Sequence, residues 1–78
     1  MHTQHFDHQE IRRLRDFLQW TMDDLAQRCQ RMGFDVSEST LTNWEKGETT
    51  PDADKLVSLA QVFGVGVERF YKAGDGKP

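Results

Sequence analysis

The chain has 78 residues, a single cysteine and a formal net charge of −3, from 13 acidic and 10 basic side chains. A chain of this length makes one domain that must bury most of its large apolar residues. A single cysteine excludes an internal disulfide, and no apolar run approaches the ~20 residues that span a membrane. We therefore expect a cytoplasmic protein in which any affinity for nucleic acid comes from local basic patches and not from overall charge.

Five helix starts follow one another along the chain. Four of them combine a capping residue with an apolar residue just before it, which pairs with another apolar residue five positions later. These four are Phe6-Asp7-x-x-Glu10-Ile11, Trp20-Thr21-x-x-Asp24-Leu25, Val36-Ser37-x-x-Thr40-Leu41 and Val65-Gly66-x-x-Arg69-Phe70. The remaining start is at Asp52, which follows Pro51. We expect Glu10 to close a capping box with Asp7, and Asp24 to close one with Thr21.

Glycines mark the helix ends. Gly33, Gly47 and Gly64 each follow an apolar-periodic run and suit the left-handed position just past a helix. The helix starts and the helix ends together predict helices near 8–19, 22–32, 38–46, 53–63 and 67–72. The sequence has no alternating strand pattern of useful length. The sequence thus predicts an all-α, compact five-helix domain over 7–72, between a flexible N-terminal segment 1–6 and a flexible C-terminal tail 73–78.

The predicted helix 38–46 has two different sides. Leu41 and Trp44 share one side, which is suited to a core. The residues on the opposite side are Ser39, Thr42, Asn43 and Lys46. Ser, Thr and Asn are poorer helix formers than the Glu, Lys and Arg of an ordinary solvated face. DNA readout would explain this choice, because Asn, Ser and Thr can contact base edges and Lys can contact a phosphate; the alternative is a short capped helix whose outer residues have no role.

Several short motifs around this helix resemble the Cro- and lambda-repressor-like helix-turn-helix domains, also called the xenobiotic-response-element family. The resemblance covers about residues 9–72. Its motifs are Leu25-Ala26, Ser37-x-x-Thr40-Leu41-Thr42, Trp44-Glu45-Lys46-Gly47, Pro51, and Leu56-x-x-Leu59-Ala60-x-x-Phe63-Gly64-Val65 leading to Phe70. The Glu-Lys-Gly segment followed by proline, placed before an apolar helix, is fairly specific, whereas the Leu-Ala pair alone is weak.

The resemblance implies a fold in which the third helix enters the DNA major groove, usually within a dimer. It implies that Ser37 caps this helix, that Glu38, Ser39, Thr42 and Asn43 face the bases, and that Lys46 lies near the DNA backbone. Glu45 would be structural and would bond the loop that follows it. The remaining structural positions of the motif are Leu25, Ala26, Leu41, Trp44 and Gly47.

Three positions depart from the family pattern. The connection Gln30–Val36 is longer than the usual turn, so we expect the second helix to extend to Met32 and Phe34 or Val36 to pack back as an anchor. Met22 stands where the family often has a phosphate-binding Gln, and two carboxylates follow it. Glu38 stands where Arg or Gln is frequent; it could accept a hydrogen bond from cytosine N4 or repel DNA.

Other residues are weaker candidates. His2, His5 and His8 are spaced by three, but they have no acidic or thiol partner, and we expect no metal and no cofactor. Cys29 lies on the apolar stripe of the second helix and is expected in the core. No nucleophile motif or phosphate loop suggests an enzyme.

The sequence leaves the partners open. Double-stranded DNA, bound as a repressor dimer, is the first hypothesis, and the dimer contact could involve Val67, Phe70 and Tyr71, unless these residues simply close the bundle. The alternative is a protein-binding module or antitoxin component that contacts a protein through Trp20, Phe34 or Tyr71.

Overall fold

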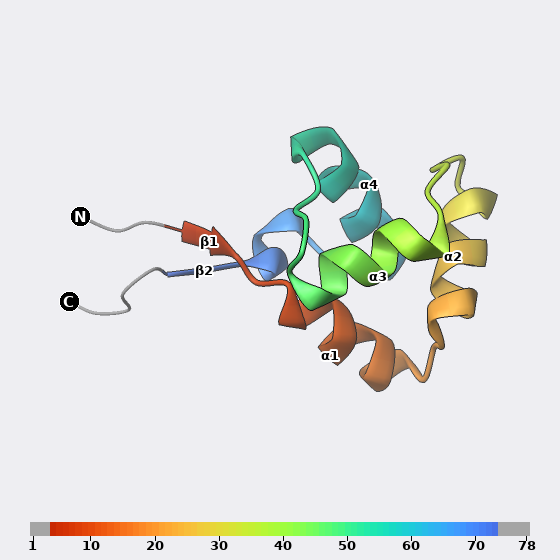
Figure 1. The fold of residues 1–78 in the computed structure, drawn as a ribbon, viewed down its shortest axis with the longest axis horizontal. Helices are drawn as coiled ribbons and strands as arrows, with labels where there is room; N and C mark the ends of the chain where they lie inside the picture. The colour runs from red at the N-terminus through yellow and green to blue at the C-terminus, as the bar shows by residue number, and fades with distance from the viewer. Residues whose placement is uncertain (1–3, 74–78) are drawn as a thin grey trace.

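Four α-helices and a short 3-10 helix form the body of the molecule, and two paired strands extend from it (Figure 1). The computed structural model describes residues 4–73. Its elements are β1 (Gln4–Phe6), α1 (Gln9–Leu18), α2 (Met22–Arg31), α3 (Glu38–Lys46), α4 (Ala53–Phe63), η1 (Val67–Phe70) and β2 (Tyr71–Ala73). The all-helical class is confirmed, but the predicted fifth α-helix is wrong, because 67–70 forms a 3-10 helix and the chain then becomes extended.

Side-chain caps begin most of the helices as predicted. Thr21 and Asp24 form a complete capping box: the Thr21 hydroxyl accepts from the Asp24 N–H, and the Asp24 carboxylate accepts from the Thr21 N–H at 2.9 Å. These hydrogen bonds lower the pKa of the Asp24 carboxyl. Ser37 caps α3 and Asp52 caps α4, each through the third N–H of its helix.

The start of α1 differs from its prediction. The backbone N–H of Asp7 donates to the carbonyl of Phe70 at 2.6 Å, so it does not take part in a capping box with Glu10. The Asp7 carboxylate accepts from the N–H of Gln9, where α1 begins. The Glu10 carboxylate instead forms ion pairs with the guanidinium groups of Arg13, at 2.9 Å, and Arg69, at 3.1 Å. The pair with Arg69 links α1 to η1.

All four α-helices end with the same pair of backbone hydrogen bonds around a left-handed residue. Gly33, Gly47 and Gly64 hold this position in α2, α3 and α4, with φ of 82°, 83° and 76°, as predicted. In α1 the position belongs to Gln19, with φ of 61°. α1 therefore ends one residue before its predicted limit, and α2 ends at Arg31, one residue before Met32.

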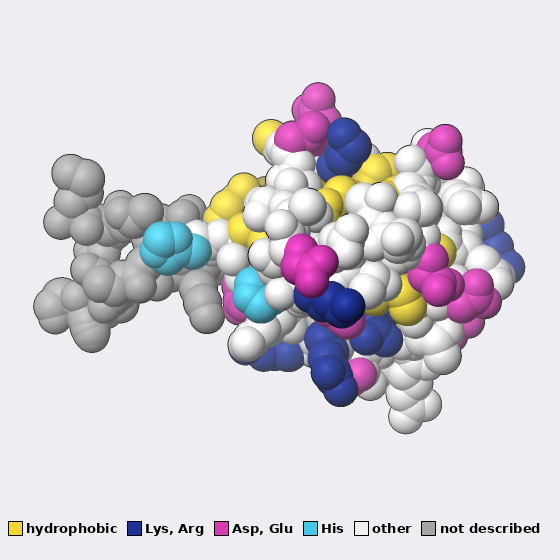
Figure 2. All heavy atoms as spheres, in the orientation of Figure 1, with side chains coloured by type: hydrophobic (Ala, Val, Ile, Leu, Met, Phe, Trp, Pro, Cys, Tyr) yellow, Lys and Arg dark blue, Asp and Glu magenta, His cyan; other side chains and the backbone are white. Residues whose placement is uncertain are grey.

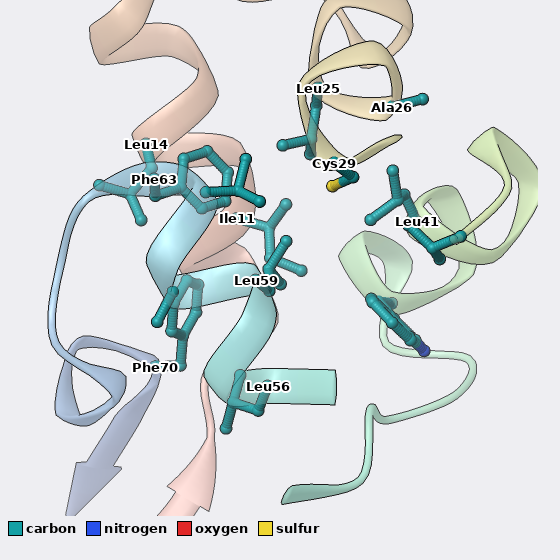
Figure 3. Packing of buried hydrophobic residues seen from close by; sticks show 14 residues of the cluster. Ile11, Leu14, Leu25, Ala26, Cys29, Leu41, Leu56, Leu59, Phe63 and Phe70 are labelled. Atoms are coloured by element: carbon teal, nitrogen blue, oxygen red, sulfur yellow. The ribbon is translucent and has the colours of Figure 1, made fainter. Parts of the chain in front are cut away.

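The core lies between the helices (Figure 3). Ile11 of α1 and Leu59 of α4 lie at its centre, and Leu25 and Cys29 of α2 face Leu41 of α3. All five of these side chains are fully buried. Each large apolar side chain stabilises the fold by about 1.5–3 kcal/mol on burial. This core holds α3 against α1 and α2.

The two strands join the ends of the described chain. β1 and β2 pair antiparallel, with Gln4 opposite Ala73 and Phe6 opposite Tyr71. The Phe6 ring stacks on that of Phe70 at 6.2 Å between centroids. The sequence-based expectation that no strand forms is therefore wrong. The rest of the expected flexible ends, residues 1–3 and 74–78, lies outside the described residues.

Candidate nucleic-acid interface

The buried side of α3 fixes the helix on the body of the molecule. Leu41 is 0% exposed and Trp44 is 3% exposed. The Trp44 ring also stacks on that of Phe34, with 6.3 Å between ring centroids. The side chains that set the rotation of α3 about its axis are thus rigidly packed, and the opposite side of the helix is fixed in direction.

That opposite side carries polar groups with no internal use. Ser39 is exposed, and Thr42 and Asn43 are half-buried. None of these three side chains hydrogen-bonds to another described residue. In the space-filling view the middle of α3 is mainly white, that is, uncharged polar or backbone surface, and charged side chains lie toward its two ends (Figure 2). Uncharged donors and acceptors on a fixed helix are thus available to an external partner.

The two ends of α3 differ in charge. Ser37 uses its hydroxyl to cap the helix and donates to the Thr40 hydroxyl at 3.0 Å. Glu38, in the first turn, is exposed and negative. Lys46, in the last turn, is exposed and makes no ion pair with a described residue. A negatively charged partner is therefore attracted to the C-terminal end of α3 more than to its N-terminal end.

Glu45 anchors α3 to α1. Arg15 donates from Nε to Glu45 Oε2 at 2.8 Å and from Nη2 to Oε1 at 3.1 Å, so the pair is bidentate. The side chains are only 14% and 17% exposed, and Arg15 also donates to the carbonyl of Trp20 at 3.0 Å. The structural role expected for Glu45 is present, but its partner is Arg15 and not the loop that follows.

His8 forms a second anchor that sequence reasoning missed. Its Nδ1 lies 3.0 Å from the backbone carbonyl of Glu45 and donates to it, because a carbonyl can only accept. The imidazole ring lies against Gly47, where an added Cβ would be 3.0 Å from ring atoms. No sequence signal links His8 to the end of α3, since the two segments are 37 residues apart.

The long connection between α2 and α3 folds back on the core. Val36 is buried, and Phe34 is half-buried against the core and stacks on Trp44. Both candidate anchors are therefore used. In Figure 1 the connection passes beside the N-terminal end of α3, away from the middle of its outer face. α2 and α3 are thus two helices joined through a packed connection, with α3 free on one side.

The comparison with known families agrees with this arrangement. A sequence model described as helix-turn-helix matches residues 11–70, which is most of the chain. The chain belongs to the helix-turn-helix family. It is also similar to an uncharacterized HTH-type transcriptional regulator of Haemophilus influenzae, with 48% identity over 33 residues. These residues are 42% of this chain and only 14% of that relative. No solved structure gives a significant match to the chain.

The start of α2, the first helix of the helix-turn-helix, is poorly suited to phosphate. Met22 is half-buried against the core and has no polar group to donate. Asp23 accepts from the Gln27 amide at 2.8 Å, and Asp24 is occupied by the capping box. Two carboxylates thus lie where a phosphate would approach the N-terminus of the helix.

The residues expected at protein interfaces are mostly packed within the helix-turn-helix domain. Phe70 is 0% exposed, so its expected direct part in a dimer contact is wrong, while Tyr71 is exposed and Val67 half-buried. The Trp20 ring stacks on that of Phe63, with 5.6 Å between centroids, and the Arg28 guanidinium lies 4.2 Å from the Trp20 ring centroid. The Phe34 ring stacks on that of Trp44. The rings of Trp20 and Phe34 thus make contacts within the domain and help to stabilise it.

The remaining candidates contribute no site among residues 4–73. Cys29 is buried, and burial raises the pKa of its thiol to about 11, which keeps it protonated and unreactive. His2 lies outside the described residues, and no group of His, Cys, Asp and Glu in the described part could hold a metal. None of the described helices is long and apolar enough to cross a membrane.

Proposed function

We propose that this helix-turn-helix protein is a sequence-specific DNA-binding transcriptional regulator that places α3 in the major groove. The observation that supports this most strongly is the outer face of α3, where Ser39, Thr42 and Asn43 have no internal hydrogen bonds. The name of the Haemophilus influenzae relative is consistent with this role. We also propose a cytoplasmic location and a role in binding, for which no catalytic group is needed.

Each residue of α3 then has a distinct task. Asn43 is suited to a bidentate contact with adenine, Thr42 to a thymine methyl or a base edge, and Ser39 to several base edges. Glu38 can accept from cytosine N4. Lys46 holds a backbone phosphate and positions the helix without reading sequence. Ser37 acts as the cap and Met22 as a packing residue at the edge of the interface.

We further propose that the protein acts as a repressor and binds as a homodimer. Occupancy of a duplex site by a domain excludes other proteins from that site. In such a dimer the α3 helices of the two protomers, ~34 Å apart, would fit two half-sites that are one turn of DNA apart. Among the residues first considered for the dimer contact, Tyr71 and Val67 keep accessible surface.

The proposal is tested by selection from randomised duplexes, followed by fluorescence anisotropy on the enriched site at two salt concentrations. We expect one near-palindromic site to be enriched. Asn43→Ala should lose about 1–3 kcal/mol of binding free energy and relax the preference at one base position. Lys46→Ala should weaken all sequences alike.

The matched control is Gln61→Ala, which removes an exposed amide from α4. It should leave affinity and sequence preference unchanged. No enrichment of any duplex at either salt concentration would exclude the proposal. Sedimentation of the free protein and of its complex, with Tyr71→Ser alongside, tests the dimer separately.

A further inference from the structure

We infer that a groove between α1 and the C-terminal end of α3 holds a backbone phosphate of the duplex, with Gln9, Arg12 and Lys46 as donors. This inference rests on the proposed function and adds α1 to the DNA-contacting surface. It assigns to one face of α1 a positioning role for DNA.

The groove has a volume of about 480 Å³ and is open to solvent. α1 contributes Gln9, Arg12 and Asp16, and α3 contributes Glu45 and Lys46. In Figure 2, Lys and Arg side chains gather where α1 borders this end of α3, with acidic side chains among them. A duplex strand that passes the end of α3 would therefore meet donors from both helices.

The two acidic residues of the groove differ in how strongly they oppose a phosphate. Glu45 is held in its bidentate pair with Arg15 and is mostly buried, so its charge reaches the groove weakly. Asp16 lies 3.7 Å from Arg12, and both side chains are mostly exposed, at 66% and 72%. An exposed ion pair of this kind is weak, and a phosphate offers the Arg12 guanidinium a bidentate partner with more charge.

Gln9 lines the groove and has a donor group with no partner among the described residues. Its amide oxygen accepts from Arg13 Nη2 at 3.3 Å. The amide NH₂ group makes no hydrogen bond with another described residue. Since a phosphate oxygen can only accept, the unused NH₂ group of Gln9 suits a phosphate ligand.

The rest of the surface around α3 favours this position for the phosphate. The first turn of α2 carries Asp23 and Asp24, and the first turn of α3 carries Glu38. Lys46, at the other end of α3, has no ion pair with a described residue. Because the carboxylates at the helix starts repel a phosphate, the DNA backbone is best held at the α1–α3 groove.

Two substitutions with opposite expected effects test this inference. Measured by anisotropy on the selected site from 0.05 to 0.3 M salt, Arg12→Gln should weaken binding about eightfold per half-site at 0.1 M salt and reduce the salt slope by about 1 for each half-site occupied. Asp16→Asn removes the competing carboxylate and should tighten binding, with a steeper salt slope. Both effects should be the same for every duplex, because phosphate contacts do not read sequence.

The charge-matched control is Arg31→Gln, in the last turn of α2 and outside the groove. It should change affinity less than twofold. Circular dichroism and urea unfolding confirm that each variant is folded, and both altered groove residues are exposed. Ethylation interference should identify one phosphate per half-site whose modification weakens the wild type but not Arg12→Gln.

Equal losses for Arg12→Gln and Arg31→Gln would overturn the inference, because they would reflect overall charge. Unchanged affinity and salt slope in Arg12→Gln would also overturn it, while leaving the proposed function intact. A wild-type chain that enriches no duplex would instead remove the proposed function and this inference together.

Discussion

At the scale of single residues, Glu45 decides how α3 is attached. Its carboxylate is bound by Arg15, its backbone carbonyl is bound by His8, and both partners lie at or in α1. Breaking one partner of a mostly buried ion pair leaves the other charge without compensation. We therefore expect Glu45→Gln to lower the free energy of unfolding by about 3 kcal/mol, measured by urea denaturation.

The control for this substitution is Glu48→Gln, which makes the same change at an exposed position in the next loop. It should change stability by about 0.5 kcal/mol or less. If the two variants were equally stable, the Arg15–Glu45 pair would contribute no more than a surface ion pair.

The residues of α3 show what a sequence reveals at this scale. The direction of Leu41, Trp44, Ser39 and Asn43 follows from helical periodicity, which depends only on near neighbours, so both sides of the helix were predicted. The partner of Glu45 was not predicted, because Arg15 lies 30 residues away and is one of 10 basic residues that could have paired with it. The groove next to Lys46 was missed for the same reason, since it forms only when α1 packs on α3.

At the scale of elements, the end of α3 makes a testable contact. Gly47 has φ of 83°, and an added Cβ would lie 3.0 Å from the His8 ring. Gly33 has φ of 82° but nothing within 4 Å of an added Cβ. The two sites thus have the same backbone conformation and differ in their neighbours.

We expect Gly33→Ala to destabilise the protein by about 1–2 kcal/mol, the cost of a left-handed conformation for a residue with a Cβ. Gly47→Ala should cost about 1 kcal/mol more, because the His8 ring must move and its bond to Glu45 weakens. Thermal unfolding of both variants gives the comparison. Equal losses would contradict the packing of His8 against Gly47.

The boundaries of helices were predicted correctly where the residues that determine them lie within or next to the helix. The caps at Thr21, Ser37 and Asp52 and the glycine stops act within one turn of the helix that they bound. The end of α1 at Gln19 has no such signal, because a glutamine rarely takes a positive φ. The strands β1 and β2 are three residues each and pair residues 4 and 73, so neither has enough length for an alternating pattern.

At the scale of the whole molecule, both ends of the described chain are tied to the same place. β1 pairs with β2, the Asp7 N–H donates to the Phe70 carbonyl, and Glu10 binds Arg69. Phe70 lies at the centre of these contacts, 6.2 Å from the Phe6 ring and 6.1 Å from the Phe63 ring, measured between centroids. It was first considered for a dimer contact, since sequence alone does not distinguish an apolar residue in a core from one in an interface.

The last prediction separates these two roles. If Phe70 belongs to the core, Phe70→Ala should lower the free energy of unfolding by about 3–5 kcal/mol at any protein concentration. This is comparable to the whole stability of so small a domain, so the milder Phe70→Leu should also be measured, with an expected loss of about 1–2 kcal/mol. The control is Phe17→Ala, the same substitution at a side chain that is 83% exposed, and it should be neutral within about 0.5 kcal/mol. A loss for Phe70→Leu that disappears as the protein is diluted would instead place Phe70 in contact with a second copy of the chain.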